Sequence, residues 1–187
     1  MFQSFLTRIQ SSPGREHQQA FLRLIIGLSV IAYMVIIHLD NPTIIFKIGV
    51  EAILFLVAAF SILAWIYISP VSTPARYISS ILVDTTAISY SIYLSGEYGV
   101  ALYPLYLWIT FGYGFRFGRE FLTICATMSI VGFSGVYVSS DYWLSHTVLY
   151  GGLLVGLVLL PAYVSVSYTH LRAHETLISI SYAVFCL

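Results

Sequence analysis

The chain alternates long apolar stretches with short polar turns. Six stretches contain few or no charged residues, and they cover about residues 20–37, 43–69, 77–94, 100–115, 121–138 and 147–164. Most approach the ~20 apolar residues that an α-helix needs to cross a bilayer, while the fourth and fifth are shorter and have aromatic residues near their ends. The pattern predicts an all-α, polytopic integral membrane protein: a bundle of six transmembrane helices, with five as the alternative.

The composition agrees with this class. Of the 187 residues, 59% are hydrophobic and 9% are charged, whereas soluble domains carry roughly 25% charged residues. The formal net charge of zero argues against a nucleic-acid partner. The two cysteines form no C-x-x-C pair and have no metal-ligand spacing, so we expect neither a metal nor a cofactor. Cys125 lies in an apolar stretch and is expected to be an inert thiol.

The charges in the turns predict an orientation. One side of the membrane collects Arg8, Arg15, Arg23, Arg76, Arg116 and Arg119. The opposite side collects Asp40, Glu97 and Asp141, with Lys47 as its base. Because Lys and Arg favour the cytoplasmic side, residues 1–19 are expected to form a cytoplasmic segment, and the six-helix domain 20–165 should return the chain to the cytoplasm. No outer turn is long enough to fold alone, so a ligand must be met within the helices or at their outer rim.

Two acidic residues lie inside apolar stretches, where a charge is costly and normally faces the bundle interior with a partner. Asp84 lies about 12 Å along its helix at ~1.5 Å per residue. It is either a polar pivot that responds to a ligand or a structural group hydrogen-bonded to Thr85, Thr86 or a neighbouring helix. Glu51 lies about 10 Å deep by the same rise. It either stands at the mouth of a lipid-facing site or, as we favour, pairs with Lys47 four residues earlier.

The stretch Gly96–Phe121 supplies the other candidates for ligand binding or signal coupling. Glu97 opens it on the outer side, and Arg116 and Arg119 close it on the inner side. The two arginines either anchor the topology, which is the favoured interpretation, or brace the helix that continues below the sixth stretch. Trp108 completes the candidates, although aromatic residues in such a position more often pack or lie at the membrane interface.

The same stretch resembles the membrane sensor region of the hybrid histidine kinases that detect diffusible signal factors, the cis-2-unsaturated fatty acids of bacterial quorum sensing. The resemblance is carried by Pro104-Leu105-Tyr106, Trp108, Thr110, Gly112, Gly114, Arg116 and Gly118. Shorter matches extend it over most of residues 16–163, at Glu16-His17, Gln19, Leu22-Arg23, Glu51, Leu82-Val83-Asp84, Tyr142-Trp143, Gly151–Leu160 and Pro161-Ala162-Tyr163.

The resemblance implies a multi-pass protein of the bacterial inner membrane that acts as the input module of a two-component sensor histidine kinase. It implies a lipid-like signal as ligand, a relay through the last helix to a cytoplasmic kinase outside this chain, and a homodimer formed through that kinase. The chain has no nucleotide-binding glycine loop followed by Lys and no catalytic constellation, so no catalytic residue is assigned. The alternatives are the sensor module of a cyclase-type receptor and a small membrane transporter, although the internal repeats typical of transporters are not visible.

Residues 166–187 differ in character from the rest. Val166–Thr176 resemble the translation of a transposase sequencing adapter, and Ile180–Leu187 resemble the flow-cell end of the same adapter in the same frame. Because such a scar did not evolve with the fold, we expect any helix in this tail to lack an evolved partner, and we expect the fold of the six stretches not to depend on it. His174-Glu175, which has the first two residues of a kinase phosphoacceptor box, is therefore not assigned as a site.

Overall fold

A computed structural model describes residues 13–69 and 71–185. Its secondary structure over these residues is helical, without strands. In chain order the elements are α2 (Pro13–Ile37), α3 (Pro42–Ile68), α4 (Pro74–Ser95), η1 (Gly96–Leu102), α5 (Pro104–Phe117), α6 (Arg119–Ser139), α7 (Asp141–Ser145) and α8 (Thr147–Phe185). The predicted all-α class is confirmed, and each predicted stretch overlaps one of the six longer helices, although α2 begins earlier and α8 ends later than predicted. Residues 1–12 of the predicted N-terminal segment lie outside the described residues.

Four of these helices have segments that are long and apolar enough to cross a membrane: Glu16–Ile37, Pro42–Ile68, Arg119–Ser139 and Thr147–Ser167. The other two, α4 and α5, do not meet the same standard. α5 has 14 residues, or about 21 Å at 1.5 Å per residue. α4 is longer, but it includes Arg76, Asp84 and many Ser and Thr residues. Because α4 contacts α2, α3, α5 and α6, its buried polar side chains face other helices.

Proline determines where the first four long helices begin. α2, α3, α4 and α5 each start at a Pro, whose missing N–H is not needed in the first turn of a helix and whose fixed φ suits it. Two starts differ from the predicted stretches for this reason. The first helix begins at Pro13, well before Ala20, and the fourth begins at Pro104, after the chain has passed through the 3₁₀ helix η1.

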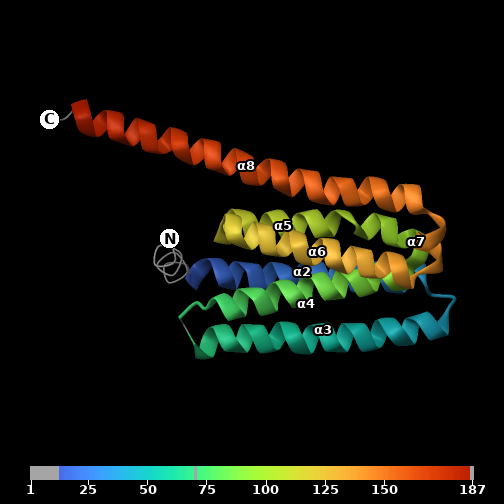
Figure 1. Ribbon diagram of the computed structural model, residues 1–187. Helices are drawn as coiled ribbons and strands as arrows, with labels where there is room; N and C mark the ends of the chain where they lie inside the picture. The colour runs from blue at the N-terminus through green and yellow to red at the C-terminus, as the bar shows by residue number, and fades with distance from the viewer. Residues whose placement is uncertain (1–12, 70, 186–187) are drawn as a thin grey trace.

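The six longer helices run alternately in opposite directions (Figure 1). α3 and α8 lie at opposite edges, with α2, α4, α5 and α6 between them, and α2 begins at the end of the bundle where α8 leaves it (Figure 1). α3 packs against α2 and α4, whereas α8 packs against α6 and α5. α5 and α6 form a close hairpin through Gly118, whose φ of 103° favours glycine.

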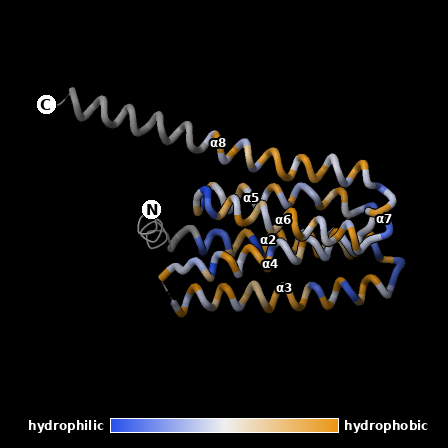
Figure 2. Tube along the Cα trace, in the orientation of Figure 1, coloured by the Kyte–Doolittle hydropathy of each residue, from blue (hydrophilic) through white to orange (hydrophobic). Residues whose placement is uncertain are grey.

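Aromatic side chains fill much of the interior of the bundle. Tyr106, Tyr113, Phe121, Phe133 and Trp143 are all buried. The ring centroid of Phe133 lies 5.9 Å from that of Tyr106 and 5.2 Å from that of Trp143, and pairs at such distances stabilise a core beyond the apolar area they bury. Apolar residues also run along the outer helices α3 and α8 (Figure 2), which gives the bundle the apolar exterior that a bilayer requires.

Candidate functional site

A cavity opens between α2, α3, α4 and α5. The space between these helices is about 650 Å³, and this figure includes the part that opens to the outside. Four of the six predicted candidates line it: Glu51, Asp84, Trp108 and Arg116. Much of the wall between them is aliphatic and comes from α2, α4 and α5, with Ile26, Ile88 and Ile109 among its side chains. The cavity therefore combines apolar walls with a few charged groups.

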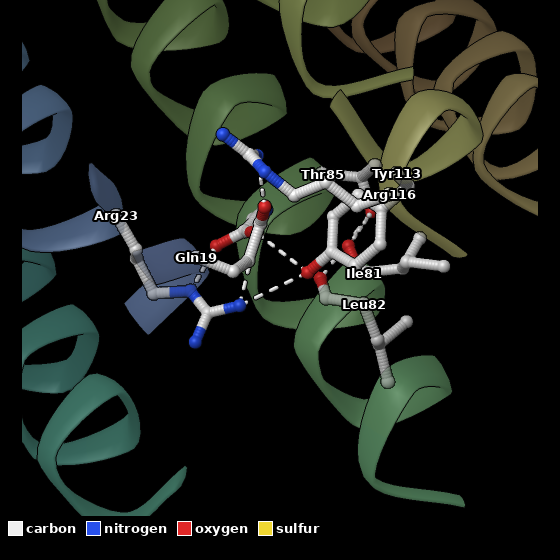
Figure 3. A network of polar contacts seen from close by, with 8 residues as sticks. Gln19, Arg23, Ile81, Leu82, Thr85, Tyr113 and Arg116 are labelled. Atoms are coloured by element: carbon white, nitrogen blue, oxygen red, sulfur yellow. Dashed lines mark hydrogen bonds and ion pairs between the residues drawn. The ribbon is translucent and has the colours of Figure 1, made fainter. Parts of the chain in front are cut away.

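Asp84 forms a buried ion pair with Arg23 of α2. Arg23 Nε lies 2.5 Å from Asp84 Oδ1, and Arg23 Nη2 lies 3.1 Å from Oδ2. Tyr113 of α5 joins them: its hydroxyl accepts a hydrogen bond from Arg23 Nη2 at 3.0 Å and donates one to Asp84 Oδ2 at 2.9 Å (Figure 3). Asp84 and Arg23 are only 7% and 6% exposed. Three helices are thus tied together by charge-assisted hydrogen bonds.

The sequence predicted a partner for Asp84 only in general terms. Thr85, one of the named partners, donates instead to the carbonyl oxygens of Ile81 and Leu82 in its own helix (Figure 3). The partner on a neighbouring helix is Arg23, which was identified from the sequence as a topology charge and as part of the family resemblance but not as a partner of Asp84. Tyr113 was also missed.

Arg116 extends the same network to a second contact between α5 and α2. Its Nη1 donates a hydrogen bond to Gln19 Oε1, and both side chains line the cavity (Figure 3). This end of the cavity therefore holds two guanidinium groups, from Arg23 and Arg116, and one carboxylate, from Asp84. The local excess is one positive charge, and guanidinium groups bind carboxylates in a bidentate geometry. An anionic group fits this end best.

Glu51 lies on α3 and lines another part of the cavity wall. Its Oε1 accepts a hydrogen bond from Ser91 Oγ of α4 at 2.6 Å. The favoured ion pair with Lys47 is wrong within the described part of the chain, whose ion pairs are Arg23–Asp84 and Arg76–Glu16. The reason is the rotation of α3: Lys47 is exposed on its outer side, while Glu51 is half-buried toward α4.

Of the remaining candidates, Trp108 lines the cavity and is 56% exposed. Glu97 is exposed in the first turn of η1 and takes no part in the cavity wall. Arg119 also lies away from the cavity, at the start of α6, where its Nε donates to Ser165 Oγ of α8 at 2.8 Å. This is the contact that the second interpretation of the arginines requires, because it joins the α5–α6 hairpin to the last helix.

A second buried ion pair closes the end of the bundle where α2 begins. Arg76 of α4 contacts Glu16 of α2 through Nη2 and donates from Nη1 to the carbonyl oxygen of Ser69 at 2.7 Å. Glu16 is 3% and Arg76 is 2% exposed. From the sequence, Glu16 is only part of the match to the sensor family, and Arg76 is only one of the cytoplasmic arginines. The sequence therefore did not predict this pair.

The cavity wall combines charged, polar and aliphatic side chains. Within the described ranges, no group of three or more His, Cys, Asp and Glu side chains lies close enough to hold a metal ion. The side chains that converge on the cavity are two cations, two acids and an indole between aliphatic walls.

The chain is similar to two known sensory/regulatory proteins. The chain is 28% identical over 160 residues to the sensory/regulatory protein RpfC of Xanthomonas campestris pv. campestris, in strain ATCC 33913 and in strain 8004. The aligned region is 83% of this chain and 22% of each relative, so the chain spans about a fifth of their length. The similarity supports a relationship to the Rpf-type sensor kinases. No protein-family model matches the chain, and no solved structure matches it.

Proposed function

We propose that this chain is the membrane-embedded input module of a two-component sensor histidine kinase. The observation that carries the proposal is the cavity, which lies among four helices, has aliphatic walls and ends on two guanidinium groups. A receptor without long outer loops must bind its signal in such a place. The 28% identity to a sensory/regulatory protein over 83% of the chain supports the same function independently.

The proposed ligand is a lipid-like anion, such as a cis-2-unsaturated fatty acid. Its carboxylate would lie between Arg116 and Arg23, where the positive groups outnumber the carboxylate of Asp84. A guanidinium–carboxylate contact is about twice as strong as a neutral hydrogen bond. The hydrocarbon chain would lie along Ile26 and Ile88, where each CH₂ removed from water gains about 0.8 kcal/mol.

The proposed relay runs through the α5–α6 hairpin to α8. Arg116 and Arg119 flank the glycine turn at Gly118, with Arg116 at the cavity and Arg119 bonded to Ser165. An anion that binds Arg116 competes with Gln19 for the same guanidinium and so changes how α5 lies against α2. The hairpin is continuous with the Arg119–Ser165 contact, so a displacement of α5 is passed to α8.

The remaining organisation is part of the same proposal. The chain crosses a bacterial inner membrane six times with both ends in the cytoplasm. In this arrangement α4 and α5 cross the membrane packed against the four more apolar helices. A cytoplasmic kinase would follow α8 in the parent protein and would form the homodimer. Residues 166–187 would then replace the native continuation of α8, as their resemblance to adapter sequence suggests.

The experiment that tests the function is ligand binding by the full chain in lipid nanodiscs. The probe is cis-2-dodecenoic acid, and the variant is Arg116→Gln, which removes the charge but keeps hydrogen-bonding capacity. We expect the affinity to fall by about tenfold, or ~1.4 kcal/mol, because a charge-assisted contact to the carboxylate is lost. The matched control is Lys47→Gln, since Lys47 is an exposed cation that does not line the cavity.

The methyl ester of the same acid is the control on the ligand side. It keeps the chain and loses the negative charge, so it should bind the wild-type protein weakly and be insensitive to Arg116→Gln. Equal affinities of the wild-type and Arg116→Gln proteins for the free acid would contradict the proposed anion site. An absence of binding to the wild-type protein would contradict the proposed ligand.

A further inference from the structure

An apolar groove lies between α3 and α4, beside the cavity. The space in the groove is about 930 Å³, and this figure again includes the part that opens to the outside. Its walls include Leu54 and Ala58 from α3 and Val83 from α4. α3 is an edge helix that packs only against α2 and α4 among its stronger contacts, and it exposes large apolar side chains along its length. In the proposed membrane arrangement the groove would therefore face the bilayer.

The groove and the cavity share part of their walls. Glu51, Phe55 and Ala87 line both of them. A single layer of side chains therefore separates the interior of the bundle from the apolar groove at its edge. Among the described residues these three are the shared wall, so the slot between α3 and α4 is where the cavity and the groove come closest.

Phe55 occupies this slot and reaches across it to α2. A Cβ atom built on Gly27 would lie 2.2 Å from Cε1 and 2.4 Å from Cζ of Phe55, so the edge of the ring lies directly against the glycine backbone. The contact uses the absence of a side chain at Gly27 to let the ring close the slot. Phe55 itself is only partly buried, and its ring can rotate toward the groove without breaking a hydrogen bond.

We propose that the slot between α3 and α4 is the lateral entrance of the cavity, that the hydrocarbon chain of the ligand passes through it from the bilayer, and that Phe55 determines which chains pass. The inference rests on the proposed function, because it needs a lipid-like ligand in the cavity. Its occupant is that ligand's chain. A lateral path keeps the chain in apolar surroundings, whereas a path through water would expose it at about 0.8 kcal/mol per CH₂.

The test separates an entrance from a binding wall by measuring rates. Ala58 lines the groove but not the cavity, so Ala58→Phe narrows the entrance and leaves the binding site as it is. The matched control is Val57→Phe on the exposed outer face of the same helix. Binding of cis-2-dodecenoic acid to the full chain in nanodiscs is followed by stopped-flow fluorescence, because Trp108 lines the cavity and reports the arrival of the ligand.

We expect Ala58→Phe to slow association and dissociation by the same factor, about tenfold, and to leave Kd unchanged. An obstacle on the path raises the barrier equally in both directions, which damage to the site would not do. Phe55→Ala removes the ring and should raise the association rate, with the largest gain for branched-chain acids, because their bulk should be hindered most by the ring. Val57→Phe should match the wild-type protein in both rates.

The outcomes distinguish the entrance from the function on which it rests. If the wild-type protein binds the acid and Ala58→Phe leaves both rates unchanged, the slot is not the entrance, and the proposed function stands. If Ala58→Phe weakens Kd at an unchanged association rate, the groove is part of the binding wall and the entrance is again wrong. If the wild-type protein does not bind the acid, the proposed ligand fails, and the entrance fails with it.

Discussion

Replacing Asp84 tests whether the buried ion pair fixes α2 against α4. The substitution Asp84→Leu removes the carboxylate and keeps an aliphatic side chain of similar size. It leaves the guanidinium of Arg23, 6% exposed, without its charge partner. Arg23 loses its contacts at 2.5 and 3.1 Å, and Tyr113 loses the acceptor that lies 2.9 Å from its hydroxyl.

The expected loss is large because an unpaired buried charge dominates it. Removing one partner of a buried pair destabilises a protein by about 3–5 kcal/mol. The double variant Arg23→Met with Asp84→Leu removes both charges, and replacing a buried pair by apolar side chains is often close to neutral. The two single changes should therefore be strongly non-additive, with a coupling free energy of at least ~2 kcal/mol.

The measurement is the free energy of unfolding in mixed micelles, followed by the loss of helical circular dichroism, for the wild-type, both single variants and the double variant. The control is Asp40→Ala, since Asp40 is exposed in the turn between α2 and α3 and its loss should change stability by no more than ~0.5 kcal/mol. Additive single effects, or an Asp84→Leu protein as stable as Asp40→Ala, would refute the claim that the pair holds the two helices together.

Four further expectations follow from contacts and charges elsewhere in the bundle. Ser91→Ala should destabilise the bundle by about 1.5–3 kcal/mol in the same assay, because Glu51 loses a hydrogen bond to a charged group; no change would mean that the bond is not formed. Arg119→Ala and Ser165→Ala should each cost about 1 kcal/mol and should not add, because both remove the same bond; additive losses would place their effects elsewhere. A reporter fused after Glu97 should read periplasmic, and a cytoplasmic signal there would overturn the proposed orientation. Truncation after Ser165 should change stability by less than ~0.5 kcal/mol, whereas a larger loss would make the tail a structural part of the protein.

The helices could be predicted from the sequence because apolar length sets them. Each predicted stretch holds one helix, and the two acids inside stretches, Asp84 and Glu51, are both withdrawn from solvent at least in part. The apolar stretches do not predict the rotation of each helix about its axis, and this rotation decides which side chains face a neighbouring helix. Lys47 and Glu51 are four residues apart and can meet on one face, but the packing of α3 on α4 turns Glu51 to Ser91 and leaves Lys47 outside.

The Arg23–Asp84 pair was missed although a signal for it existed. Arg23 comes ten residues after Pro13, and Asp84 comes ten residues after Pro74. Both helices begin at their Pro and run in the same direction, so the two charges lie at the same level, about 15 Å from the start of each helix. The sequence prediction started the first helix at Ala20, which placed Arg23 near the membrane surface. The equal depth of Arg23 and Asp84 was therefore not recognised.

The polar side chains of α2 explain why the cavity is suited to respond to charge. Glu16, Gln19 and Arg23 are three and four residues apart, so they lie on one face of the helix, and each contacts a different side chain of α4 or α5. Two of these contacts are buried ion pairs, whereas the Gln19 contact joins a neutral amide to a guanidinium at the cavity wall. In the proposed function, an anion in the cavity would replace the amide without leaving an unpaired charge. In the proposed function the Gln19–Arg116 contact is therefore the one that the ligand exchanges, while the ion pairs keep α2 attached to α4.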